Sequence, residues 1–212
     1  ERFIHSFYPR IKGKTSNYIV IFLVSLLVLI IARLLFNIKD INYINNLQFL
    51  IPIPIVVMTL SLLFTPNIAM ICGTIVSILI TLMYKADFYL FIYLFLSSCM
   101  ATFTMLNIVR RTDLIRSGNI VGLLNFSLIV AIGFIMEIND ITWIVANGLI
   151  GFCGALTASI ITLGLLPYLE GVFNISTSLS LMEQANLNHP LIKRLMMTAP
   201  GTYQHSLMVA NL

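Results

Sequence analysis

Long runs of hydrophobic residues alternate with short polar joints along most of this chain. The first run, 17–36, is nearly unbroken isoleucine, leucine and valine, and its length suits a helix that crosses a hydrocarbon core of about 30 Å. Further runs follow at 47–64, 68–83, 88–108, 120–136 and 141–166. This pattern predicts an all-α, polytopic membrane helix bundle of six spans.

The second and third runs are shorter than the others. Pro52 and Pro54 lie near the start of the second run, where a lost backbone hydrogen bond costs least, and Thr65-Pro66-Asn67 separates the two runs. Both runs are short for a full crossing. Region 47–83 therefore contains either two crossings or a hairpin that dips into the membrane and returns.

Composition agrees with lipid as the main solvent. Of the 212 residues, 59% are hydrophobic and only 9% are charged, whereas soluble domains carry about 25% charged residues. The formal charge of +4 comes from residues at the ends of the spans and not from one polar face, which argues against nucleic acid as a partner.

The basic residues also predict an orientation. With six crossings both ends lie on one side, which then collects nine of the twelve Lys and Arg: Arg2, Arg10, Lys12, Lys14, Arg110, Arg111, Arg116, Lys193 and Arg194. The stretch 110–116 is read as the most charged loop. Because basic residues are enriched in cytoplasmic loops, both ends of the chain are expected in the cytoplasm. The chain is thus predicted to be a multi-pass protein of the cell membrane.

Few polar groups are expected inside the spans. Ion-coupled transporters need buried ionisable residues along their pathway. Such residues are nearly missing from the predicted spans, which argues against an ion-coupled transporter. Asn107, Asn125 and Asn147 are read as interhelical hydrogen-bonding or interfacial groups, in preference to a ligand site. The three cysteines, Cys72, Cys99 and Cys153, have no metal-like spacing and are read as buried thiols.

Small residues repeat along the last span. Gly151, Ala155 and Ser159 form one column, and Gly154, Ala158 and Thr162 form a second column beside it. Such a face lets another backbone approach closely, either within the bundle or in a second copy of the chain. A homodimer through this face is a hypothesis.

The character of the chain changes at Pro167. Ser180 and Glu183 match a capping box, and Pro190 suits the first turn of a helix through Met197 that Pro200-Gly201 ends. Thr202 would then cap a final helix. The predicted parts are a basic entry segment (1–16), the bundle (17–166), a cytoplasmic coupler of short helices (167–201) and the start of another domain (202–212).

The last part of the chain resembles a known family. Leu187 to Leu212 reads LNHPLIKRLMMTAPGTYQHSLMVANL, and LLPYLEGVFNISTSLSLME precedes it. This order of a last membrane helix, a Leu-Asn-His-Pro linker and a Gly-Thr-Tyr-x-His-Ser helix start is similar to the PgpH-type 7TM receptors with an intracellular HD hydrolase. The resemblance implies a bacterial cell-membrane protein that cleaves cyclic di-AMP.

The resemblance also assigns one site residue. His205 aligns with the first metal ligand of the HD site, where a pair of divalent metals (Mn or Fe) activates water. The other ligands would lie downstream, so the chain is interpreted as a fragment with no catalytic residue, cofactor or cyclic di-AMP site of its own. His5 and His189 are read as interfacial and linker residues.

Two other functions remain open from the sequence. A small-molecule transporter or channel-like bundle without enzymatic activity is the alternative to a sensory and anchoring domain. A purely structural anchor is the third.

Overall fold

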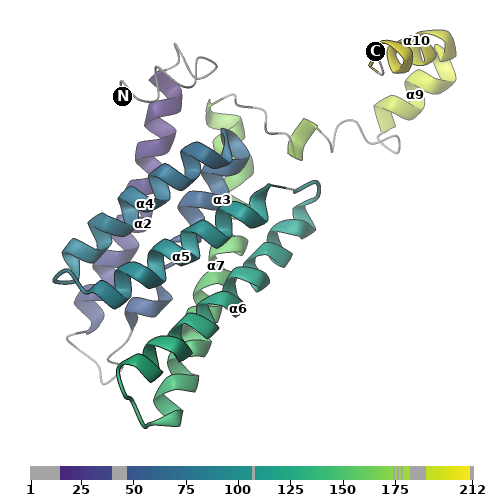
Figure 1. Ribbon diagram of the computed structural model, residues 1–212. Coiled ribbons are helices and arrows are strands. Elements are labelled where there is room, and N and C mark those ends of the chain that lie inside the picture. Colours follow the sequence, from purple (N-terminus) through teal and green to yellow (C-terminus); the bar gives the residue numbers. More distant parts are fainter. Residues whose placement is uncertain are drawn as a thin grey trace.

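The computed structural model describes residues 15–39, 47–106, 108–173, 175, 177, 179–181 and 190–210 (Figure 1). Within these ranges the regular structure is helical. The helices are α2 (Thr15–Lys39), the 3₁₀ turn η2 (Leu47–Leu50), α3 (Pro54–Leu63), α4 (Pro66–Met83), α5 (Phe88–Met105), α6 (Arg111–Ile135), α7 (Ile141–Phe173), α9 (Pro190–Thr198) and α10 (Pro200–Ala210). The predicted all-α membrane bundle is confirmed.

Within the described parts of the chain, five helices are long and apolar enough to cross a membrane, one fewer than the six expected spans. The second expected span is instead the shorter pair of η2 and α3, which covers Leu47–Leu63. Pro52 interrupts this segment, and α3 begins only at Pro54, whose missing N–H is harmless in the first turn of a helix.

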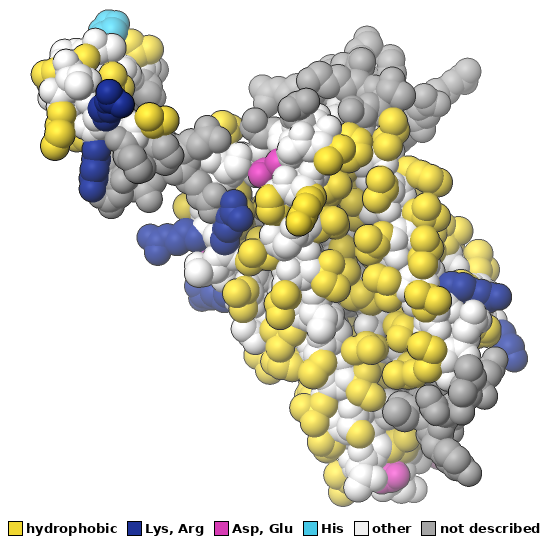
Figure 2. Space-filling view, turned by 180° about the vertical axis from the view of Figure 1, so that it is seen from behind, with side chains coloured by type: hydrophobic (Ala, Val, Ile, Leu, Met, Phe, Trp, Pro, Cys, Tyr) yellow, Lys and Arg dark blue, Asp and Glu magenta, His cyan; other side chains and the backbone are white. Residues whose placement is uncertain are grey.

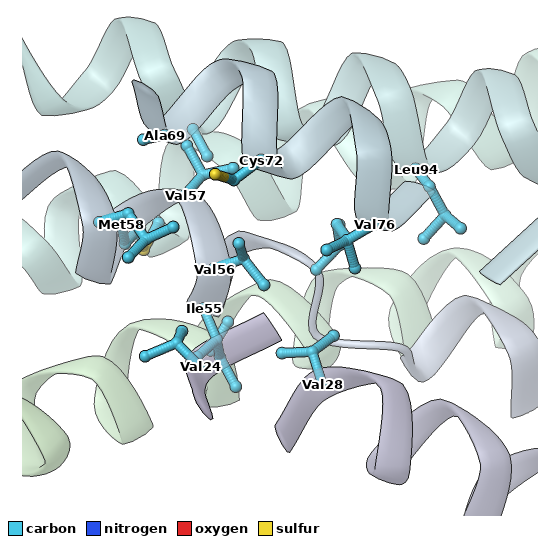
Figure 3. Close-up of a cluster of buried hydrophobic side chains, with 14 of the residues drawn as sticks. Val24, Val28, Ile55, Val56, Val57, Met58, Ala69, Cys72, Val76 and Leu94 are labelled. Carbon is cyan, nitrogen blue, oxygen red and sulfur yellow. The ribbon is translucent and has the colours of Figure 1, made fainter. Parts of the chain in front are cut away.

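Helix α3 is short because it lies in the centre of the bundle and has no lipid-facing side. Every residue of α3 except Ser61 is buried, and the helix packs against α2, α4, α5 and α7. Figure 3 shows residues of α3 such as Ile55 and Val56 between Val24 of α2 and Val76 of α4. The longer helices therefore form the lipid-facing shell.

The η2 and α3 segment carries the chain back across the bundle. The Tyr84 hydroxyl, just after α4, donates a 3.0 Å hydrogen bond to the Ala32 carbonyl near the end of α2, and the rings of Tyr84 and Phe36 meet edge-on. The ends of α2 and α4 therefore lie together, so the two helices run in parallel. Region 47–83 thus returns to the end of the bundle where it began, as either a pair of crossings or a hairpin would, and α4 with its 18 residues is long enough to cross.

The beginning of α2 and the end of α7 consequently lie at the same end of the bundle, and α9 and α10 lie to one side beyond it (Figure 1). Helix α2 packs through a stripe at every fourth position, Val20, Val24, Val28 and Ala32, which are fully buried. Much of the surface facing outward from the bundle is hydrophobic (Figure 2), as lipid requires.

Two helices extend beyond their predicted ends. Helix α6 begins at Arg111 and not at residue 120, so most of the predicted charged loop is helical. The Asp113 carboxylate accepts hydrogen bonds from the N–H groups of Val109 (3.1 Å) and Arg110 (2.8 Å), which stabilises this start. Helix α7 continues through Pro167 to Phe173, so the expected boundary at 166 is not a helix end.

The predicted cap at Thr202 is also wrong. Helix α10 begins at Pro200, in the first-turn position that suits proline, and Thr202 lies inside it. Ala199 alone separates α10 from α9, and its N–H bonds to the Leu195 carbonyl at 2.9 Å. The two short helices are therefore joined almost directly.

Candidate functional site

His205 lies on α10 with its side chain exposed. No group of three or more His, Cys, Asp or Glu side chains that could hold a metal occurs among the described residues. His5 and His189 lie outside the described residues. The imidazole of His205 is accessible to a metal, but it belongs to no such group in the described part of the chain.

The small residues of α7 pack within the chain. A Cβ added at Gly151 would lie 2.5 Å from the side chain of Ile129 in α6, and one at Gly154 would lie 3.1 Å from the Leu50 carbonyl of η2. Ala155, Ala158 and Ser159 are fully buried. This face is thus packed against α6 and η2 within the chain, and a homodimer stays a prediction.

Glycines of α6 complete the same contact from the other side. A Cβ at Gly118 would lie 2.4 Å from the Ser159 hydroxyl oxygen, and one at Gly122 would lie 2.7 Å from the Phe152 ring. These positions explain why α6 and α7 form the most extensive helix pair. Sequence reasoning found the small residues of α7 but missed their partners in α6.

A polar cluster lies in the core where η2 meets α5, α6 and α7. The Tyr93 hydroxyl donates a 2.7 Å hydrogen bond to the Phe49 carbonyl, and a Cβ at Gly151 would lie 3.2 Å from the same hydroxyl oxygen. The Asn125 amide donates to the Gly151 carbonyl at 3.4 Å, while its Oδ1 atom has no partner. Within this cluster the Tyr93 hydroxyl satisfies a backbone carbonyl of η2, next to the point where the helix is broken.

Sequence analysis missed this role of Tyr93, because its aromatic ring reads as one more hydrophobic residue of α5. The asparagines predicted within the membrane differ in the partners of their side-chain amides. Asn147 is buried and donates to the Trp143 carbonyl of its own helix at 2.7 Å, whereas Asn125 reaches another helix. Asn107 lies outside the described residues.

Most hydroxyl groups in the spans bond to their own helix. Ser77 and Thr81 donate to carbonyls four residues earlier, at 2.8 Å each, and Thr102 does so at 3.0 Å. By contrast, the hydroxyls of Thr59, Ser97 and Thr162 are fully buried and have no hydrogen-bond partner among the described residues. Cys72 is buried as expected, Cys99 is half-buried and Cys153 is exposed, which corrects the expectation for these two thiols.

An apolar groove of about 300 Å³ lies between α2 and α4. Phe22, Leu26, Cys72 and Leu79 are among the residues that line it. Because both helices are long enough to cross the membrane, hydrocarbon is the medium that this groove meets.

The chain turns back after α7. The Thr177 hydroxyl donates to the Glu170 carboxylate and accepts a 3.2 Å hydrogen bond from the N–H of Ser180. Thr177 is therefore the capping residue of the short turn at 179–181, and the predicted cap at Ser180 is wrong; Glu183 lies outside the described residues. Thr177 and Leu179 are 1% and 2% exposed, so this turn is held against the bundle.

These features define a class of protein: a helical integral membrane domain with a central buried helix and short helices beyond its last span. Residues 2–177 match the family described as 7TM receptor with intracellular HD hydrolase, and the chain belongs to this family.

Relatives support the same assignment. The chain is 33% identical over 211 residues to the cyclic-di-AMP phosphodiesterase PgpH of Listeria monocytogenes, with 95% of this chain and 28% of that protein covered. It is 26% identical over 215 residues to PgpH of Bacillus subtilis, covering 95% of this chain and 29% of that protein. An uncharacterized protein of Synechocystis is 44% identical over 68 residues, covering 32% of this chain and 8% of that protein.

The chain thus spans less than a third of the length of the two PgpH relatives. No solved structure matches it.

Proposed function

We propose that this chain is the membrane anchor and regulatory domain of a cyclic di-AMP phosphodiesterase of the HD family. The main support for this proposal is the similarity to two PgpH phosphodiesterases. It covers 95% of the chain, and so includes the membrane bundle and not one helix alone. The bundle itself carries no cluster of metal-binding side chains among the described residues. Hydrolysis is therefore assigned to the part of the parent protein that follows α10.

In the intact parent, His205 would be the first ligand of a divalent metal pair, Mn or Fe. Neutral imidazole suits these metals, and the pair would supply activated water for attack on the phosphodiester. The exposed position of His205 on α10 leaves its ring accessible to ligands from a following domain. Helix α10 would then contain the start of that domain, and α9 would belong to the coupler that joins it to the bundle.

The proposed orientation places both described ends of the bundle in the cytoplasm. Arg110, Arg111 and Arg116 surround the start of α6, at the bundle end where α7 finishes, as the enrichment of basic residues in cytoplasmic loops predicts. Cyclic di-AMP made inside the cell could reach a domain attached there.

Topology is tested by cysteine labelling in a variant without Cys72, Cys99 and Cys153. A cysteine at exposed Met197 should react with a membrane-impermeant maleimide only after the cells are opened. One at exposed Glu137, in the turn between α6 and α7, should react in intact cells. The opposite labelling pattern would overturn the orientation and remove the access of the attached domain to an intracellular nucleotide.

The enzymatic assignment is tested in the intact parent protein. His205→Ala should lower both bound metal and cyclic di-AMP hydrolysis, because one metal ligand is lost. Gln204→Ala changes the adjacent exposed side chain and serves as the matched control. Unchanged metal content and hydrolysis in His205→Ala would contradict the assignment.

Regulation is tested by comparing two forms of the parent. The membrane-attached enzyme should differ in activity from the isolated soluble part, and perturbing the bundle, for example by Gly118→Ala in the contact between α6 and α7, should change the activity of the membrane-attached enzyme. Identical activity of the variant and the unsubstituted membrane-attached enzyme would leave anchoring as the function of the bundle.

A further inference from the structure

Pro167 lies in the interior of α7, near its cytoplasmic end as proposed above. Proline has no N–H to donate to the carbonyl four residues earlier, which belongs to Leu163, and its ring crowds that carbonyl. Sharp bends in helices occur at such positions. The ladder of hydrogen bonds in α7 is therefore weakest between the bundle and the segment that follows it.

Two glycines flank this weak point, and neither has a packing role. A Cβ at Gly164 or at Gly171 would meet no atom within 4 Å. By contrast, a Cβ at Gly148 of the same helix would lie 2.7 Å from the Phe126 ring. A helix interior favours alanine over glycine, so these two open positions lower the stability of α7 without any gain in packing.

The segment beyond the weak point is held down by a small set of contacts, which we call the latch: Leu166, Leu169, Glu170, Thr177 and Leu179. Leu166 and Leu169 are buried, and Leu179 joins the hydrophobic core. The Thr177 hydroxyl ties the returning chain to the Glu170 carboxylate. Apart from Leu166, each member follows Pro167, so a bend there would move the rest of the latch as a unit.

We propose that α7 bends at a hinge formed by Gly164, Pro167 and Gly171, between the latched state seen here and a released state. In the released state the last turns of α7 leave the bundle together with the turn at 179–181. The hinge would thus set the position of whatever follows the bundle. This inference goes beyond the proposed function, because it depends on helix geometry and not on the reaction of an attached domain.

The experiment measures a distance across the hinge in the full chain in lipid nanodiscs. With the native cysteines replaced, spin labels are placed at Phe103 of α5 and Val172 in the last turn of α7, both exposed. Double electron–electron resonance then gives the distribution of distances between the labels. A hinge predicts two populations, one latched and one released.

Substitutions at the hinge should remove the released population. Gly164→Ala, Gly171→Ala and Pro167→Ala each stiffen α7, and the first two place a methyl group in open space, where it disturbs no neighbour. Gly201→Ala is the matched control, because Gly201 is an equally open glycine in α10, and it should leave the distribution unchanged.

Weakening the latch should have the opposite effect. Thr177→Val keeps the shape of the side chain but loses the bond to Glu170, so the released population should grow. Thr157→Val is its control, since the Thr157 hydroxyl bonds only to the Gly154 carbonyl of its own helix, at 3.0 Å. A single narrow population that none of these substitutions alters would overturn the hinge, while leaving the phosphodiesterase assignment untouched.

Discussion

The hydroxyl of Tyr93 and the backbone carbonyl of Phe49 are joined by a 2.7 Å hydrogen bond in the centre of the bundle, and their rings meet edge-on with centroids 5.3 Å apart. Tyr93 is fully buried on α5, and Phe49 belongs to the 3₁₀ turn that precedes the central helix. The bond supplies a donor to a carbonyl that no regular helix satisfies, which fixes the break in the chain before α3.

Tyr93→Phe should therefore destabilise the bundle by about 1 kcal/mol, because the Phe49 carbonyl loses its donor in an apolar interior. Tyr84→Phe is the matched control: Tyr84 also donates to a carbonyl, that of Ala32, but this carbonyl lies inside α2 and keeps its helical donor. Reversible unfolding in mixed micelles measures the change in the free energy of unfolding for both variants. An equal or larger loss in Tyr84→Phe would contradict this explanation.

Gly118→Ala should destabilise the pair of α6 and α7 by about 1–3 kcal/mol, the usual cost of overpacking. The new methyl group would lie 2.4 Å from the Ser159 hydroxyl oxygen and 3.3 Å from the Ala155 carbonyl. Adding Ser159→Gly should restore part of the stability, as a thermal melt of the double variant would show. No loss in the single variant would mean that the two helices separate easily.

Ala86→Gly should stabilise the protein by about 1 kcal/mol, because Lys85 and Ala86 have φ angles of 61° and 59°, where non-glycine residues are strained. These residues form the tight turn between α4 and α5. Ala155→Gly, in a buried helical position, should have the opposite sign. A thermal melt of each variant tests this prediction. A melting temperature of Ala86→Gly below that of the unsubstituted protein would disprove it.

Asp140 should make the start of α7 sensitive to acid. The Thr142 hydroxyl and the N–H groups of Trp143 and Thr142 hold the pKa of this carboxyl below its ordinary value. A lowered pKa in the folded state means that the stabilisation is complete above the ordinary value, about 3.9, and is lost as the pH falls through the depressed value.

Asp140→Asn keeps a capping side chain but cannot ionise, so it should remove this part of the pH dependence. Amide hydrogen exchange at the first turn of α7, measured between pH 5 and pH 3 on both proteins, provides the test. Parallel pH dependence in the two proteins would exclude Asp140 as its source.

The helices and their order could be predicted from the sequence because lipid imposes length and hydrophobicity on each outer helix. The central helix escaped this rule. It faces protein on all sides, so its 10 residues need not match the thickness of the bilayer. Pro52 and Pro54 signalled the irregular start, but hydropathy gave no means of separating a buried helix from a short crossing.

Helix ends were harder to predict, for a local reason. Arg110 and Asp113 read as a charged loop, yet the carboxylate of Asp113 bonds to the N–H groups at the helix start and so extends α6. Pro167 read as a helix end, yet buried side chains on either side keep α7 continuous. In both places, bonds and packing outweighed the intrinsic preference of one residue.

The candidate site was predictable only in part. His205 was identified by resemblance, and no structural neighbour among the described residues adds to it. The small residues of α7 were identified by spacing, but spacing alone could not decide whether α6 or a second chain covers them. Tyr93 gave no signal, because the carbonyl it meets belongs to a residue 44 positions away.

The burial of α3 has a consequence for how the bundle would respond to the bilayer around it. When lipid tails shorten or lengthen, the outer helices must change their tilt to keep their apolar surfaces covered. The central helix touches no lipid tail and has no such need. Membrane thickness would therefore reorient the surrounding helices about a core that stays fixed.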